Sequence, residues 1–66
     1  MIKNKLKDIR MREYAMNQTE FSELLDISIS QYNRYENNTG YPSLEIALKI
    51  AYKLNKDVKD IFSLVD

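Results

Sequence analysis

Apolar residues recur along the chain at spacings of three and four positions, which is the periodicity of an amphipathic helix. Most runs begin just after a short polar residue, whose side chain can accept a hydrogen bond from a backbone N–H group of the first helical turn. Strand signals are nearly confined to the apolar ends, at residues 1–2 and 64–65. The pattern predicts an all-α fold with helices over residues 5–14, 18–25, 29–37, 44–54 and a short stretch after Asp57.

Two of these helix starts carry the stronger signal of a capping box, in which a Glu or Gln three residues after the cap bonds back to the cap's backbone. Asn17 and Glu20 form one such pair, and Ser28 and Gln31 form the other. After the third helix, residues 37–42 are nearly all typical of turns, so they predict the longest loop.

The fourth predicted helix is the most apolar and is expected to form the centre of the core. It follows Pro42 and the cap Ser43, and Lys49, Lys53 and Lys56 are interpreted as its solvated face. Its core residues are expected along one stripe with two neighbours beside it: Leu44, Ala47, Leu48, Ala51 and Leu54, with Ile46 and Ile50.

The second and third helices stand very close together in the chain. Only Asp26, Ile27 and the cap Ser28 separate them, which forces the helices to cross steeply with Ile27 beneath the turn. This is the geometry of a helix-turn-helix unit. On the third helix, Tyr32 and Tyr35 lie three positions apart and are expected to face the core.

The opposite face of the third helix is polar and carries side chains that can read base edges. Asn and Arg make bidentate contacts with adenine and guanine, and a small or apolar side chain can touch the methyl group of thymine. A face built only for solubility would more often carry Glu and Lys, and this face carries neither. The candidates for DNA base contacts are Ile29, Ser30, Asn33 and Arg34.

Composition excludes several function classes. The 66-residue chain has no Cys and no His, so the usual zinc ligands and disulfides are missing, and no metal or cofactor is expected. We find no nucleophile elbow or phosphate loop, and the single Gly cannot build a phosphate cradle, so an enzyme is not expected. No signal peptide is evident, and no apolar run approaches the roughly 18 residues of a membrane span. The expectation is a soluble, cytoplasmic protein without a membrane or a small-molecule ligand as partner.

The charges balance at ten basic and ten acidic residues, but they are unevenly placed. Residues 1–14 are basic and residues 15–36 are acidic. Zero net charge argues mildly against nucleic acid as a partner, because non-specific affinity comes mainly from Lys and Arg on phosphates. If the protein binds DNA, amides, hydroxyls and backbone N–H groups must supply many of the backbone contacts, and the salt dependence should be shallow.

The segment of residues 17–36 resembles the Cro/repressor-type helix-turn-helix family of bacterial and phage regulators, and the likeness extends over residues 6–62. The residues that match the family pattern occur in its order: Leu6, Arg10, Gln18, Phe21, Ser22, Ile27, Ser28, Glu36, Pro42 and Ser43. The resemblance implies one compact, lambda-repressor-like domain of five helices over residues 6–62, with the motif at residues 17–36.

The resemblance also implies roles for individual residues. Helix 29–37 would dock in the major groove with its N-terminal residues toward the bases. Arg10 and Glu36 would form a structural ion pair. The DNA backbone contacts would come from polar residues around this helix: Gln18, Ser28, Asn37, Asn38, Thr39 and Tyr41. A homodimer would form through the C-terminal residues Ile61, Phe62, Leu64 and Val65, and residues 1–3 and 63–65 could pair as a small antiparallel sheet, as in some short family members.

Three positions depart from the family pattern. One extra residue lies between Arg10 and Gln18, so the turn after the first helix is expected to be longer, and Arg12 could compete for Glu36. Asp26 and Asn38 stand where the family usually has Gly, and both residue types tolerate the left-handed backbone conformation.

Together, the pattern and the resemblance predict a homodimeric, sequence-specific repressor that occludes a promoter at a two-fold symmetric operator in double-stranded DNA. Two alternatives stay open. The chain could be a protein-interaction module, such as an antitoxin or accessory subunit, or the N-terminal DNA-binding domain of a longer repressor.

Overall fold

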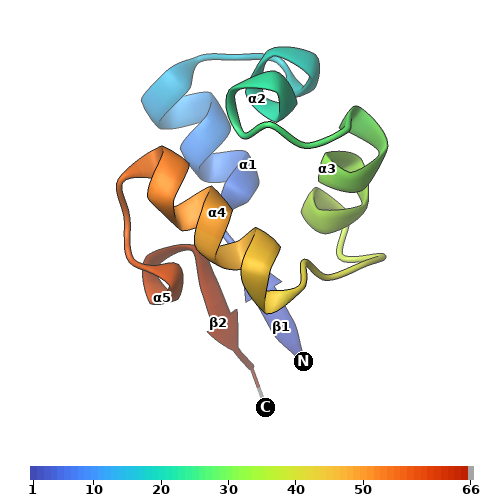
Figure 1. The fold of residues 1–66 in the computed structure, drawn as a ribbon, viewed down its shortest axis with the longest axis vertical. Helices are drawn as coiled ribbons and strands as arrows, with labels where there is room; N and C mark the ends of the chain where they lie inside the picture. Colours follow the sequence, from blue (N-terminus) through green and yellow to red (C-terminus); the bar gives the residue numbers. More distant parts are fainter. Residues whose placement is uncertain (66) are drawn as a thin grey trace.

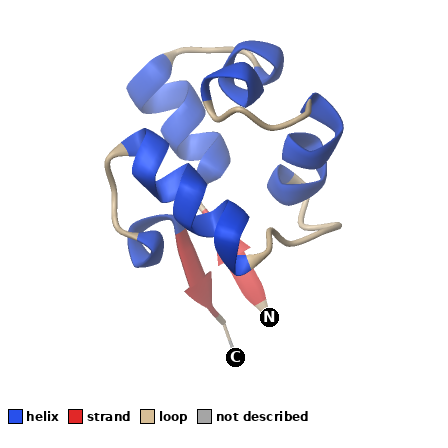
Figure 2. Ribbon diagram, viewed as in Figure 1, coloured by secondary structure: helices blue, strands red, loops and turns tan. Residues whose placement is uncertain are grey.

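Short helices make up most of the structure, a computed structural model that describes residues 1–65, and the helical fold class is confirmed (Figures 1 and 2). η1 is a π-helix that continues α1, so the two form the first predicted helix. In chain order the elements are β1 (Ile2–Asn4), α1 (Leu6–Asp8), η1 (Ile9–Tyr14), α2 (Gln18–Leu24), α3 (Ile29–Glu36), α4 (Leu44–Leu54), α5 (Val58–Ile61) and β2 (Phe62–Leu64).

The two strands at the chain ends pair with each other, as the resemblance implied. They run antiparallel, with Lys3 opposite Ser63 at the centre of the register. Beyond the strands, the backbone N–H of Val65 donates to the carbonyl oxygen of Met1 at 2.8 Å. The two ends of the chain therefore lie side by side below the helices in Figure 1.

The extra residue between Arg10 and Gln18 enters the first helix and not the turn after it, which corrects our expectation. Residues Ile9–Tyr14 are wound as a π-helix, whose wider turns hold one more residue than an α-helix over the same rise. The helix then ends at Ala15, which has a left-handed conformation with φ 51°. Arg12 does not compete for Glu36: its Nε lies 4.0 Å from Asp8 Oδ1, and its side chain is 83% exposed.

The predicted caps are present at α2, α3 and α4. Asn17 accepts from the backbone N–H of Glu20 at 2.8 Å, and Ser28 Oγ accepts from that of Gln31 at 3.1 Å. Both capping boxes are closed in return by the Glu20 and Gln31 side chains. Ser43 Oγ accepts from the first turn of α4 at 3.2 Å. These local bonds fix where each helix begins.

The core lies where the helices converge, and it includes both tyrosines of α3, as predicted. Tyr32 is fully buried and packs edge-on against Phe21, with ring centroids 5.5 Å apart. An edge-to-face pair adds about 0.5–1.5 kcal/mol to the burial of its rings. The cluster draws on α1, η1 and every later helix: Leu6, Ile9, Phe21, Leu25, Tyr32, Tyr35, Ile50, Ala51, Leu54 and Ile61.

The predicted core stripe of α4 is partly wrong. Ala47, Ile50, Ala51 and Leu54 are buried, but Leu44 and Leu48 are 73% and 52% exposed. Leu44 and Leu48 are spaced four apart with Tyr52, which is 84% exposed. At 3.6 residues per turn, this row lies about 100° around the helix from the buried residues. Leu44, Leu48 and Tyr52 therefore form a row of exposed side chains along α4 and not part of the core.

The lysine face of α4 is also corrected, because two of its three lysines are tied to the fold. Lys49 Nζ donates to the backbone carbonyl of Asp26 at 2.9 Å and lies 3.2 Å from its carboxylate. Lys56 Nζ lies 3.1 Å from the carboxylate of Glu13.

Among residues 1–65, no helix is long and apolar enough to cross a membrane.

Candidate nucleic-acid interface

The four candidates for base contacts gather on the outer face of α3. Ile29, Ser30, Asn33 and Arg34 together line one open, shallow hollow. Ile29 is 41% exposed although it is apolar. The two tyrosines of the same helix turn inward and anchor it to the core. α3 therefore presents one apolar and three polar side chains on a single exposed surface.

The turn that leads into α3 depends on a left-handed residue. Asp26 has φ 59°, as expected for a residue at a position where the family usually has Gly. Lys49 of α4 holds both the carbonyl and the carboxylate of Asp26. Ile27 then lies half-buried against the core, which brings Ser28 into position to cap α3. Two contacts therefore stabilise the turn: Lys49 binds Asp26, and Ile27 packs against the core.

The buried carboxylate of Glu36 holds the C-terminal end of α3. Arg10 donates to it from Nε at 3.2 Å and from Nη2 at 3.1 Å, which is the expected ion pair. The Tyr32 hydroxyl and Gln18 Nε2 also donate to it, the latter at 3.0 Å. The Glu36 side chain is only 5% exposed, and that of Arg10 is 12% exposed. A planar guanidinium with two parallel bonds fixes orientation as well as charge.

These contacts shift the titration of all three groups. Burial by itself raises the pKa of Glu36, but the hydrogen bonds from Arg10, Tyr32 and Gln18 outweigh it and lower the pKa overall. The hydrogen bond to Glu36 raises the pKa of Arg10. Burial, followed by the bond to Glu36, raises the pKa of Tyr32, so its hydroxyl remains a donor. Glu36 therefore stays ionised and accepts only.

Gln18, a candidate backbone contact, is engaged at both ends of its amide. Its Nε2 donates to Glu36, and its Oε1 accepts from Asn33 Nδ2 at 3.1 Å. Asn33 in turn accepts from Asn37 Nδ2 at 2.9 Å. Three residues assigned to DNA from the sequence thus form one hydrogen-bonded chain across α2 and α3.

Arg34, the cation on this face, folds back over the loop that follows α3. A Cβ atom placed on Gly40 would lie 3.1 Å from Arg34 Nε and 3.2 Å from Nη2. Gly40 does not have a positive φ, so its lack of a side chain serves to give Arg34 room. The Arg34 guanidinium thus lies close to Gly40.

The remaining candidates for backbone contacts flank α3 at its two ends. Ser28 is exposed but uses its hydroxyl oxygen in the cap, while Tyr41 is 51% exposed. Asn38 has φ 59°, as expected, and Thr39 Oγ1 donates to the carbonyl of Arg34 at 3.4 Å. The loop after α3 thus carries exposed polar groups next to the C-terminal end of the helix.

A family model described as Helix-turn-helix matches residues 6–61, which include every helix of the structure. The chain belongs to the Cro/repressor-type helix-turn-helix family. A comparison with curated proteins gives no significant match. As a member of this family, the chain is in general terms a DNA-binding transcription regulator.

Sequence reasoning missed three features of this helix-turn-helix unit. Lys49 braces the turn, Gly40 gives room to Arg34, and the Tyr32 hydroxyl completes the Glu36 site. Lys49 lies 23 positions from Asp26, so no local pattern could pair them. The single Gly of the chain was a usable signal, because it stands in a loop beside a candidate DNA-contact helix.

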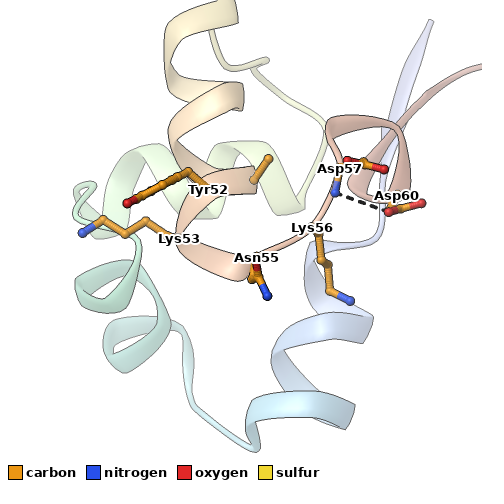
Figure 3. A pocket seen from close by; sticks show the side chains of 7 residues that line it. Tyr52, Lys53, Asn55, Lys56, Asp57 and Asp60 are labelled. Carbon is orange, nitrogen blue, oxygen red and sulfur yellow. Dashed lines mark hydrogen bonds between the residues drawn. The ribbon is translucent and has the colours of Figure 1, made fainter.

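A second open hollow lies at the turn between α4 and α5, and its chemistry does not single out a ligand (Figure 3). Its charged side chains are two lysines and two aspartates, Lys53, Lys56, Asp57 and Asp60. The backbone N–H of Asp57 donates to Asp60 at 3.3 Å, which is a local bond at the start of α5. In Figure 1, α3 and α5 lie on opposite sides of α4. Over residues 1–65, no cluster of acidic side chains could hold a metal ion.

Proposed function

We propose that the chain is a homodimeric, sequence-specific repressor that docks α3 in the major groove of a two-fold symmetric operator and occludes a promoter. The observation that carries the proposal is the shared surface of Ile29, Ser30, Asn33 and Arg34 on α3. Their chemistry matches the groove edges of thymine, adenine and guanine. The Arg10–Glu36 pair and the Lys49 brace support this helix from behind, as a reading surface needs.

The phosphate contacts proposed around α3 are mostly neutral. Ser28, Asn37, Asn38, Thr39 and Tyr41 are all exposed on the flanks of the helix. Arg34 is the single Lys or Arg among residues 15–43, so we expect few counterions to be released on binding. The expected result is a shallow dependence of operator affinity on salt, with discrimination that depends on direct base contacts.

Dimerisation is proposed through an apolar groove between the strands, the start of α4, and α5. The groove is lined by Ile2, Pro42, Leu44, Ala47, Val58 and Phe62. Beside it Leu64 is 84% exposed, and Val65 is partly exposed. Ile61, which we had assigned to the interface, is 1% exposed and belongs to the protomer's own core, so that assignment is corrected. Phe62, Leu64 and Val65 remain the proposed interface residues.

A dimer is also favoured by the size of the module. A single reading helix on 66 residues buries little DNA surface, and such small modules bind weakly alone. Two copies related by a two-fold axis would place two α3 helices about one helical turn of DNA apart.

The decisive experiment is the selection of binding sites from a pool of randomised duplexes, followed by titration on the selected and scrambled duplexes. Asn33→Ala and Arg34→Ala should each weaken binding to the selected duplex by about 1–3 kcal/mol per half-site and relax one base preference. Lys59→Ala on α5 is the matched control, because it removes the same charge away from α3.

Equal affinity of the wild type for selected and scrambled duplexes would contradict sequence-specific binding and favour the protein-interaction module instead. The dimer has its own measurement, which is sedimentation equilibrium at micromolar concentration. Leu64→Asp should give a folded monomer with reduced operator affinity, because it places a charge on an exposed apolar residue of the interface. A wild-type monomer at these concentrations would contradict the proposed homodimer.

A further inference from the structure

Three amide side chains at the DNA-facing surface are joined in a fixed direction. Asn37 Nδ2 donates to Asn33 Oδ1 at 2.9 Å, and Asn33 Nδ2 donates to Gln18 Oε1 at 3.1 Å. Gln18 Nε2 then donates to Glu36 Oε1 at 3.0 Å. The chain of bonds starts at the exposed end of α3 and ends on a carboxylate that is 5% exposed.

The carboxylate decides the direction of the whole chain. Glu36 is ion-paired with Arg10, and an ionised carboxylate can only accept hydrogen bonds. Turning the Gln18 amide round would place its oxygen against an oxygen of Glu36. Gln18 must therefore present its own oxygen to Asn33, and Asn33 must present its NH2 group to Gln18 and its oxygen to Asn37.

Asn33 keeps enough bonding capacity to read a base in this orientation. A primary amide has two N–H hydrogens and two oxygen lone pairs. Asn33 uses one hydrogen on Gln18 and one lone pair on Asn37, so one of each remains. Adenine offers the complementary pair in the major groove, with N7 as acceptor and the N6 amino group as donor.

We infer that Gln18 and Glu36 are positioning residues for Asn33, which set the direction of its amide so that one base of each half-site is read as adenine. This inference rests on the proposed DNA-binding function. It gives Gln18 a role different from a phosphate contact. A phosphate contact changes affinity for all duplexes alike, whereas a positioning role changes the preference at one base.

The test compares base preferences of the wild type with those of Gln18→Met, Asn33→Ala and the double variant, all by selection from the same randomised pool. Gln18→Met keeps the length and apolar stem of the side chain and removes both amide bonds. Thr19→Val, on the exposed neighbour of Gln18, is the control. The position at which Asn33→Ala loses its base preference identifies the base that Asn33 reads.

At that position the wild type should prefer adenine roughly tenfold or more. Gln18→Met should reduce this preference to about twofold and leave the other positions unchanged, and the double variant should lose nothing further there. A uniform loss of affinity in Gln18→Met with the adenine preference intact would overturn the inference and leave Gln18 as a phosphate contact. Failure of the wild type to select any duplex would overturn the proposed function together with this inference, so the two failures are distinguishable.

A measurement without DNA keeps the inference testable even if variants bind weakly. In NMR exchange measurements, the side-chain NH2 proton of Asn33 that is bonded to Gln18 should exchange with solvent more slowly in the wild type than the unbonded proton does. That protection should be lost in Gln18→Met and kept in Thr19→Val. Equal, unprotected signals in the wild type and Gln18→Met would contradict the fixed orientation. Circular dichroism spectra that match the wild type would show that the variants are folded.

Discussion

Arg10 should contribute more to stability than any other charged side chain of the first helix. Its guanidinium makes two bonds to the Glu36 carboxylate, and its Nη1 donates to the carbonyl of Met16 at 3.0 Å. Arg10→Met keeps much of the apolar stem but leaves the buried carboxylate without its counter-charge. Breaking a buried pair by removing one partner costs about 3–5 kcal/mol. Tyr32 and Gln18 still donate to Glu36, so we expect the lower part of that range, about 3 kcal/mol.

That loss is large for a chain of this length. At about 0.05–0.15 kcal/mol per residue, 66 residues give a free energy of unfolding of about 3–10 kcal/mol. The variant should therefore lose between about a third and all of its stability. Urea unfolding followed by far-ultraviolet circular dichroism measures the change, at one fixed protein concentration because dimerisation would shift the midpoint.

Arg12→Met is the matched control, because Arg12 lies on the same helix and is 83% exposed beside Asp8. A surface pair of this kind contributes about 0.3–0.5 kcal/mol, so its midpoint should hardly move. If Arg10→Met and Arg12→Met unfold within about 1 kcal/mol of each other, the buried pair does not stabilise the fold as we describe.

Three further outcomes follow from other contacts. The pKa of Glu36 is lower in the folded than in the unfolded chain, so ionised Glu36 stabilises the fold. This contribution to the free energy of unfolding should be complete above about pH 5 and should fall as the pH drops through the folded pKa. Urea midpoints between pH 7 and 3 measure the change, and a loss of stability that begins on raising the pH would contradict it. Ala15→Gly should raise the free energy of unfolding by about 1 kcal/mol and so raise the urea midpoint, because Ala15 has φ 51°, and a lower midpoint would argue against strain there. Gly40→Ala should displace Arg34 and weaken operator binding several-fold in titrations with stability nearly unchanged, whereas unchanged binding would show that the close packing is irrelevant.

Local chemistry made much of the fold predictable. The caps at Asn17, Ser28 and Ser43 act over three residues, so the sequence alone locates these helix starts. The left-handed turns at Asp26 and Asn38 follow from residue types that tolerate positive φ. Ala15 has the same conformation without such a signal, because it ends η1, where its backbone N–H donates to the carbonyl of Arg10.

Features that depend on contacts distant in sequence were less predictable. The helical periodicity of α4 predicted Leu44 and Leu48 in the core, but both are exposed. Apolarity alone does not reveal how α4 is rotated against its neighbours. On the candidate site, the exposed face of α3 was predictable from Tyr32 and Tyr35 opposite it. The bond between Gln18 and Asn33 was not, since it joins two helices and requires both rotamers.

The wide turn of η1 has a consequence for how sequences of this family should be aligned. An extra residue in an ordinary α-helix rotates everything after it by about 100°, whereas a π-turn holds the residue and leaves the later chain in place. Arg10 can thus still meet Glu36 although the spacing to Gln18 is longer. An alignment that places the gap in the loop at residues 15–17 would match residues 11–14 with the wrong positions of other family members. The extra residue is best placed inside the helix, where the wide π-turns of η1 can hold it.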